Sequence, residues 1–227
     1  MTSPETPAVV GDSRQLQIER LVAGGDAMAR DADGRVVFIE GALPGETVDV
    51  ELIVVKRDFA RGRVTGIVTP SPQRVVPPCA HVADGCGGCD WQHVSIAHQR
   101  SLKSEVVREQ LSHLGGITHV NGKPLAEFEV IALSPNEDGL RWRTRNRYAR
   151  IGGVSVGMKM PRSHTVIEID DCLIAVEGSV ELAQAKVHLG HGDISTAQSS
   201  SGQHVVVDQR GGPWLDETVG DRSWRIH

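Results

Sequence analysis

Three of the four cysteines in this chain lie within eleven residues, in the stretch CAHVADGCGGCDWQH that runs from residue 79 to residue 93. The fourth cysteine lies far downstream. Thiolates are soft ligands, and a clustered trio completed by one remote cysteine is a common way to hold an iron-sulfur cluster. The Gly87-Gly88 pair allows the backbone to turn closely around such a group. The spacing therefore favours an iron-sulfur cluster, and its candidate ligands are Cys79, Cys86, Cys89 and Cys172.

Zinc is the second interpretation of the same residues. It also accepts four sulfur ligands, but structural zinc sites usually pair two short Cys-x-x-Cys knuckles, and Cys172 has no such companion. Thiols without any ligand are the third interpretation. His81 lies between the cysteines and could ligate a metal, and His93 follows them and could donate a hydrogen bond to a cluster sulfur. A structural role is the favoured interpretation of both, because four cysteines already fill the sites of a cluster.

The cysteine stretch resembles the cluster segment of the bacterial RNA uracil-carbon-5 methyltransferases. The resemblance rests on Pro77-Pro78-Cys79, Cys86-Gly87-Gly88-Cys89 and Trp91-Gln92-His93. It implies a 4Fe-4S cluster held by the four cysteines in the same order, with a TRAM domain before them. One departure is visible, since six residues separate Cys79 from Cys86 where the family pattern has five. One added loop residue costs little closure entropy, so the expected ligands are unchanged.

Residues 15–70 show the pattern of a small all-β domain. Val48, Val50, Leu52 and Val54 recur at every second position, the period of a strand with one face on a core. Turn residues break the rest into about five short strands, which favours an OB-like barrel. Several segments also resemble the TRAM domain, namely Gly24-Gly25, Asp33-Gly34, Val37-Phe38-Ile39, the run from Gly41 to Glu46, and Lys56.

Basic residues near the end of this domain are candidates for RNA contact, because the domain that it resembles binds RNA. A solvated basic hairpin is the alternative, since charged loop tips are common. The candidate phosphate-binding residues are Lys56, Arg57, Arg61 and Arg63.

The segment from Arg141 to Arg150 is the second basic feature. In a strand, Arg141, Arg143, Arg145 and Arg147 would share one face. The net charge of the chain is −5, so RNA binding must come from local patches of this kind. The row predicts phosphate contacts, with Trp142 or Tyr148 available for packing or base stacking. The alternative is cross-strand ion pairs with nearby acidic residues.

The remaining pattern alternates helices and strands. A helix is expected after His93, capped by Ser95 and ended by Gly115-Gly116. Strands are expected at 154–160, 165–169 and 203–208, a helix at 177–189, and a polar loop at 195–202. The strand before Asp170-Asp171-Cys172 is expected to bring the fourth cysteine back to the other three.

These patterns predict a mixed fold of two domains, an OB-like all-β barrel (TRAM) followed by an α+β central domain with a cysteine-ligated cluster. In the family that the chain resembles, a Rossmann-like methyltransferase domain follows, and we expect it to be absent here. The expected boundaries are a disordered N-terminus at 1–14, the TRAM domain at 15–70, the linker and cluster loop at 71–93, the central RNA-binding domain at 94–222, and the start of the methyltransferase domain at 223–227.

The resemblance predicts the RNA-binding and iron-sulfur portion of an S-adenosylmethionine-dependent RNA uracil-C5 methyltransferase, truncated before its catalytic domain and acting on rRNA or tRNA. Methylation at carbon 5 needs a thiolate that adds at carbon 6. Because all four cysteines are assigned to the cluster, we expect no catalytic residue and no S-adenosylmethionine-binding residue in this chain. The chain alone is therefore expected to be inactive, with S-adenosylmethionine a cofactor of the complete protein only.

A reducing cytoplasm suits thiolate ligands, and the sequence has neither a signal-peptide core nor an apolar run that could span a membrane. We expect a cytoplasmic monomer that binds RNA and has no protein partner. Two other functions fit parts of the pattern. A zinc- or iron-sulfur-stabilised RNA-binding module would lack methyltransferase activity, and an electron-transfer iron-sulfur protein would need neither the barrel nor the arginines.

Overall fold

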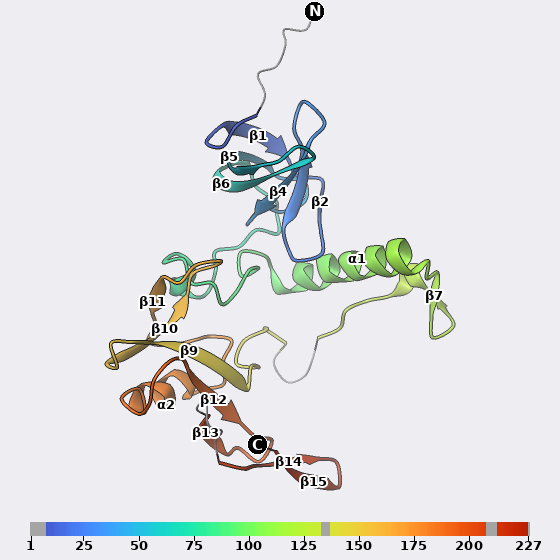
Figure 1. The fold of residues 1–227 in the computed structure, drawn as a ribbon. Helices are drawn as coiled ribbons and strands as arrows, with labels where there is room; N and C mark the ends of the chain where they lie inside the picture. The colour runs from blue at the N-terminus through green and yellow to red at the C-terminus, as the bar shows by residue number, and fades with distance from the viewer. Residues whose placement is uncertain (1–7, 133–136, 208–212, 227) are drawn as a thin grey trace, which may run out of the picture. The chain divides into compact units, whose positions relative to one another are not determined.

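The computed structural model describes residues 8–132, 137–207 and 213–226 (Figure 1). The chain divides into two compact units. Unit 1 contains residues 1–77 and 90–131, and unit 2 contains residues 78–89 and 132–227. All four cysteines therefore fall in unit 2. Within the described ranges, no helix has both the length and the apolar character needed to cross a membrane.

Unit 1 is built on a six-stranded sheet with the strand order β1-β5-β6-β4-β3-β2. The pair β4 and β6 is parallel and the other neighbours are antiparallel, so the sheet is mixed. The sequence predicted about five strands, and the structure has one more. The strands are β1 (Ser13–Gln17), β2 (Arg20–Leu21), β3 (Ala27–Arg30), β4 (Val36–Glu40), β5 (Thr47–Val55) and β6 (Phe59–Thr69).

The alternation predicted along β5 is confirmed from Val48 to Leu52 but not at Val54, which is only partly buried and follows a shift in the register with β6. Val48, Val50 and Leu52 are fully buried in the core of unit 1, while Asp49 and Glu51 between them are only partly buried. Helix α1 (Ile96–Gly115) contributes Leu102 to the same core. The helix follows Ser95 and ends at Gly116, whose φ of +60° is the left-handed conformation that glycine adopts readily. Both ends were predicted from the sequence. Short elements follow it, namely β7 (His119–Val120), β8 (Lys123–Pro124) and the 3-10 turn η2 (Leu125–Glu127).

Unit 2 contains a five-stranded antiparallel sheet with the order β11-β10-β9-β12-β13. Helix α2 (Ser179–Ala185) covers one face, where Val180 and Ala183 pack with Tyr148 and Ile194. A separate hairpin and the 3-10 turn η1 (Ala80–Val82) complete the unit. The strands are β9 (Arg145–Ile151), β10 (Ser155–Lys159), β11 (Val166–Glu168), β12 (Ile194–Gln198), β13 (His204–Val207), β14 (Leu215–Val219) and β15 (Arg222–Ile226).

The strands predicted at 154–160, 165–169 and 203–208 are confirmed as β10, β11 and β13, although residue 208 lies outside the described residues. The loop predicted at 195–202 was wrong in its first half, because β12 runs to Gln198. The segment is polar, so its sequence does not show the pattern of a strand. Thr196 is buried in this strand, and its hydroxyl contacts Ser179 Oγ at 2.6 Å. The helix predicted at 177–189 is shorter and begins after Gly178, which has a φ of +76°.

Candidate nucleic-acid interface and cysteine site

The arginine-rich segment becomes a strand only from Arg145 onward. Arg145 and Arg147 are exposed, while Asn146 and Tyr148 are buried, as the period of two in a strand requires. β9 pairs with β12 so that Arg145 lies opposite Ala197 and Arg147 opposite Ser195. Arg143, just before β9, is also exposed. The predicted separation of faces is therefore observed for Arg145 and Arg147. It is absent before the strand, where Trp142 and Thr144 are exposed along with Arg143.

Arg141 departs from this row. It has a φ of +54°, and its guanidinium donates to both carboxylate oxygens of Asp171, at 2.8 and 2.6 Å. Neither the strand geometry nor the shared face that the sequence predicted for Arg141 is present. The Asp171 pairing raises the pKa of Arg141 and lowers the pKa of Asp171. Arg141 therefore holds the segment that leads into Cys172.

The other three guanidinium groups form no ion pair within the described part of the chain. The charges of Arg143 and Arg145 are only minor causes of the pKa shifts of neighbouring groups. The pKa of Glu217 is lowered chiefly by the Ser200 N–H that its carboxylate accepts, with the charge of Arg145 a smaller cause. Three like charges on one exposed segment repel one another, and an anionic ligand would relieve that repulsion.

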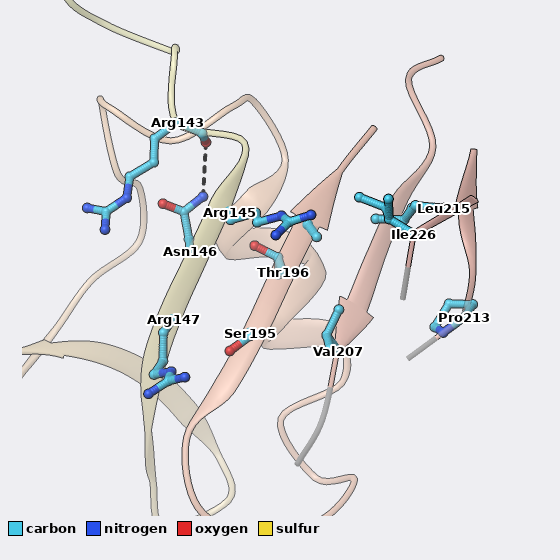
Figure 2. A pocket seen from close by; sticks show the side chains of 11 residues that line it. Arg143, Arg145, Asn146, Arg147, Ser195, Thr196, Val207, Pro213, Leu215 and Ile226 are labelled. Carbon is cyan, nitrogen blue, oxygen red and sulfur yellow. Dashed lines mark hydrogen bonds between the residues drawn. The ribbon is translucent and has the colours of Figure 1, made fainter. Parts of the chain in front are cut away.

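A pocket of about 290 Å³ lies beside these arginines, and we call it the β9 pocket. Figure 2 shows the Arg145 side chain extending across β12, whereas the Arg143 guanidinium points to the other side of β9. Leu215 and Ile226 of the β14–β15 hairpin stand on the far side of the pocket from β9. The lining residues are Arg143, Arg145, Asn146, Arg147, Ser195, Thr196, Ala197, Val207, Pro213, Leu215 and Ile226.

The sequence did not reveal the non-arginine part of this pocket. Ser195 fell within a predicted loop, and the terminal strands β14 and β15 were not predicted as strands. The hairpin is tied to the turn after β12 by polar contacts that leave no hydrophobic pattern. Thr218 N–H donates to Ser200 Oγ at 2.7 Å, and Asp216 N–H donates to the Gln203 side chain at 2.8 Å.

The basic residues predicted in the TRAM region lie at the β5–β6 turn and along β6. Lys56 and Arg57 are exposed in the turn. Arg61 pairs with Asp26 at 2.7 Å and lies over the Phe38 ring. Arg63 pairs with Glu51 at 2.8 Å. The sheet therefore pairs Arg61 and Arg63 with acidic neighbours of unit 1.

The cysteine loop docks on the β10–β11 turn within unit 2. Gly87 N–H donates to Lys159 O at 3.0 Å, and a side chain at Gly87 would place its Cβ 2.6 Å from that oxygen. Burial raises the pKa of the Cys86 thiol, and charge on Cys79 and Cys172 raises it further. These three thiols are therefore in electrostatic reach of one another. All four cysteines are partly buried.

The two histidines of this stretch differ in their contacts, because His81 has acidic partners whereas the buried Nε2 of His93 has no hydrogen-bond partner among the described residues. The His81 Nε2 lies 2.9 Å from Asp170 Oδ1, two residues before Cys172, and Nδ1 lies 3.4 Å from Asp84 Oδ2. In unit 1, burial and then the charge of Arg74 lower the pKa of His93 to about 4. Across the described ranges, no three His, Cys, Asp or Glu side chains are arranged as a metal-binding group.

Comparison with known proteins identifies a matching domain and several similar proteins. Residues 7–65 match the TRAM domain. The chain is 35% identical, over 93% of its own length and 43% of the relative, to a 23S rRNA (uracil(1939)-C(5))-methyltransferase of Halomonas elongata. An uncharacterized RNA methyltransferase of Streptomyces coelicolor is also 35% identical, over 78% of this chain and 40% of that protein. The chain's relatives are RNA methyltransferases. It spans less than half the length of these two.

A solved structure corrects the predicted fold class. The Pyrococcus abyssi tRNA (uracil-54, C5)-methyltransferase in complex with S-adenosyl-L-homocysteine aligns with a TM-score of 0.58 and 17% identity, over 93% of this chain and 59% of that one. The sequence predicted a barrel and an α+β domain without a methyltransferase fold. The described residues instead align with a methyltransferase over most of this chain, so the predicted fold class, which had no methyltransferase fold, was wrong. The pairing of strands in a sheet depends on tertiary contacts that local sequence does not encode.

Proposed function

We propose that this chain binds RNA as part of an S-adenosylmethionine-dependent enzyme that methylates carbon 5 of uracil in rRNA or tRNA. The observation that carries the proposal is the exposed arginine row at Arg143, Arg145 and Arg147, which lacks ion-pair partners among the described residues and borders a pocket. The names of the relatives supply the reaction class. We place this activity in the cytoplasm.

The arginines suit phosphate binding in geometry and in charge. Alternate residues on a strand lie roughly 6.6 Å apart, so Arg145 and Arg147 present two separate donors to an extended phosphate backbone, with Arg143 just before the strand. Each guanidinium offers a planar fork of N–H donors that matches a phosphate. The sheet beneath fixes their spacing. Lys56, Arg57, Arg61 and Arg63 form a second proposed contact in the TRAM domain, and Arg141 contributes by positioning the segment that carries the row.

The chemistry of the reaction separates RNA binding, which we propose for this chain, from the methyl transfer itself. Methylation at carbon 5 requires a nucleophile at carbon 6 and a methyl donor. We assign neither a nucleophile nor an S-adenosylmethionine site to any residue of this chain. Its proposed task is to hold the RNA so that one uracil can be reached, after it has left its stack.

The experiment is a binding assay with the full chain on transcripts of 23S rRNA segments and tRNA, with duplex DNA of equal length as the comparison. We expect tighter binding to RNA than to the duplex DNA, because an exposed strand with a pocket beside it suits unpaired nucleotides. Equal affinity for both, or no binding, would contradict the proposal.

We further propose that Cys79, Cys86, Cys89 and Cys172 hold a 4Fe-4S cluster. The support is the soft donor set, its spacing, and the docking of the cysteine loop next to the segment that carries Cys172. When bound, the cluster would supply a covalent tie between these segments, which makes metal binding part of the folding energy. Zinc on the same thiols is the second candidate.

Anaerobic purification followed by iron, sulfide and zinc analysis separates the two. A cluster predicts a brown protein with about four irons and four sulfides per chain. One zinc and no iron would support the zinc-stabilised module. The Cys172→Ser variant should lose iron and soluble protein together, and a normal iron content in that variant would refute the four-cysteine assignment.

A further inference from the structure

We propose that the β9 pocket binds one unstacked base of single-stranded RNA, while Arg145 and Arg147 bind the phosphates on either side of it. This inference rests on the proposed function and adds to it a specific occupant for a specific cavity. The base would differ from the uracil that is methylated. The pocket lining contains no cysteine, histidine or carboxylate, so it has none of the usual groups for nucleophilic or acid-base chemistry.

The register of the sheet explains why there is a hollow at this place. Ala197 and Ser195 lie opposite Arg145 and Arg147 on β12, and Val207 lies opposite Ser195 on β13. Cross-strand partners share a face, so two small side chains separate the arginines from the valine. Helix α2 packs on the Tyr148 and Ile194 face of the same strands. The face with the small residues is left open between long side chains.

The chemistry of the lining changes across the hollow. The β9 side is cationic, whereas Val207, Leu215 and Ile226 on the other side are apolar. A nucleotide has the same division, with an anionic phosphate on one side and a flat, weakly polar base on the other. The Ser195 hydroxyl makes no hydrogen bond to another described residue and offers one polar contact to a base edge. A single polar contact discriminates little between bases, so we expect the pocket to accept more than one kind of base.

The size of the pocket limits what can enter. Its volume of about 290 Å³ is near the lower end of ligand pockets, which run from roughly 300 to 1,000 Å³. A single base is small enough for a pocket of this scale. A base enters such a pocket only after it has left its stack, so single-stranded RNA is favoured over a duplex.

The test uses the full chain and two RNAs of equal length, a uridine oligonucleotide and its abasic counterpart with the same ribose-phosphate backbone. Ala197→Met fills the hollow and keeps every arginine, and Ser195→Leu does so at a more exposed position in case the first variant does not fold. The double variant Arg145→Ala/Arg147→Ala removes the proposed phosphate contacts. Lys186→Ala removes a charge from the exposed end of α2 and is the control.

We expect each filling variant to lose about tenfold in affinity for the uridine oligonucleotide, which corresponds to roughly 1.4 kcal/mol of contact between the base and the apolar lining, and to bind the abasic RNA like the wild type. The double variant should bind both RNAs more weakly. If the filling variants keep the uridine affinity while the double variant loses it, the row binds only backbone and the base pocket is refuted, although RNA binding stands.

Two other outcomes are distinct from that one. If the wild type binds neither RNA, the proposed function itself fails. If the wild type binds but all three pocket variants bind as well as it does, RNA lies elsewhere and the pocket proposal is overturned.

Discussion

Arg74 clamps the buried carboxylate of Glu46 through two nitrogens, with Nε 2.6 Å from Oε1 and Nη2 2.7 Å from Oε2. The Leu43 and Ser71 N–H groups donate to the same carboxylate. Burial raises the pKa of Glu46, but the Arg74 guanidinium and the two N–H donors outweigh it and hold that pKa below its usual range. The turn before β5 and the chain after β6 are thus joined at one ionised group.

Removing one partner of this pair should be costly. Arg74→Met leaves the fully buried Glu46 charge uncompensated, and we expect a loss of about 3 kcal/mol in the free energy of unfolding. Arg20→Met, which breaks the exposed Arg20–Glu109 pair of the same unit, should cost less than about 1 kcal/mol. Urea unfolding of both variants measures the difference. Equal losses would show that the clamp is not a stabilising feature.

The buried His93 should make stability depend on pH. Its pKa falls from 6.5 to about 4 on folding, so between these values the unfolded chain binds the additional proton. The contribution of His93 to the free energy of unfolding is therefore fully present above about pH 6.5. It decreases as the pH falls toward 4, by on the order of 3 kcal/mol. His93→Phe should remove that part of the pH dependence. Urea unfolding at several pH values tests it, and an unchanged profile in the variant would contradict the assignment.

Two adjacent glycines should respond differently to alanine. At Gly87 a Cβ would lie 2.6 Å from Lys159 O and 2.8 Å from Pro161 N, both backbone atoms that cannot easily move. At Gly88 the nearest atom is Met158 Cε at 3.2 Å, the end of a flexible side chain. We expect Gly87→Ala to destabilise by about 2 kcal/mol and Gly88→Ala by much less. Thermal unfolding that ranks the two variants in the opposite order would refute this docking of the loop.

The single tyrosine of the chain reports on the sheet beneath the arginines. Burial raises the pKa of Tyr148 to about 12, and its hydroxyl lies 2.7 Å from Ser179 Oγ. Ultraviolet titration of tyrosinate should therefore show a midpoint near 12 in the folded chain, and near 10 in denaturant. Ser179→Ala should cost about 1 to 3 kcal/mol, because Tyr148, Asn146 and Thr196 lose a shared buried partner. A midpoint near 10 in the folded chain would place Tyr148 in water.

Sequence patterns located the elements with strong periodicity and missed those held by polar contacts. The alternation in β5 and the glycine after α1 have local causes, so both could be predicted. Strand β12 contains a buried hydroxyl contact between Thr196 and Ser179, and a hydrophobic pattern in the sequence cannot predict such a contact. Arg141 continues the arginine repeat in sequence yet turns away to Asp171, because its partner comes from a segment thirty residues later. The parallel pairing of β4 with β6 was also beyond local reasoning.

The salt dependence of RNA affinity measures whether the arginines of β9 bind phosphates. For single-stranded RNA, the logarithm of the binding constant should fall linearly with the logarithm of salt concentration, by about 0.7 for each phosphate neutralised. Arg145→Ala/Arg147→Ala should therefore reduce the slope by about 1.4, while Lys186→Ala on the other face should leave it unchanged. A slope that is the same in the double variant and the wild type would show that the exposed face of β9 does not bind the RNA backbone.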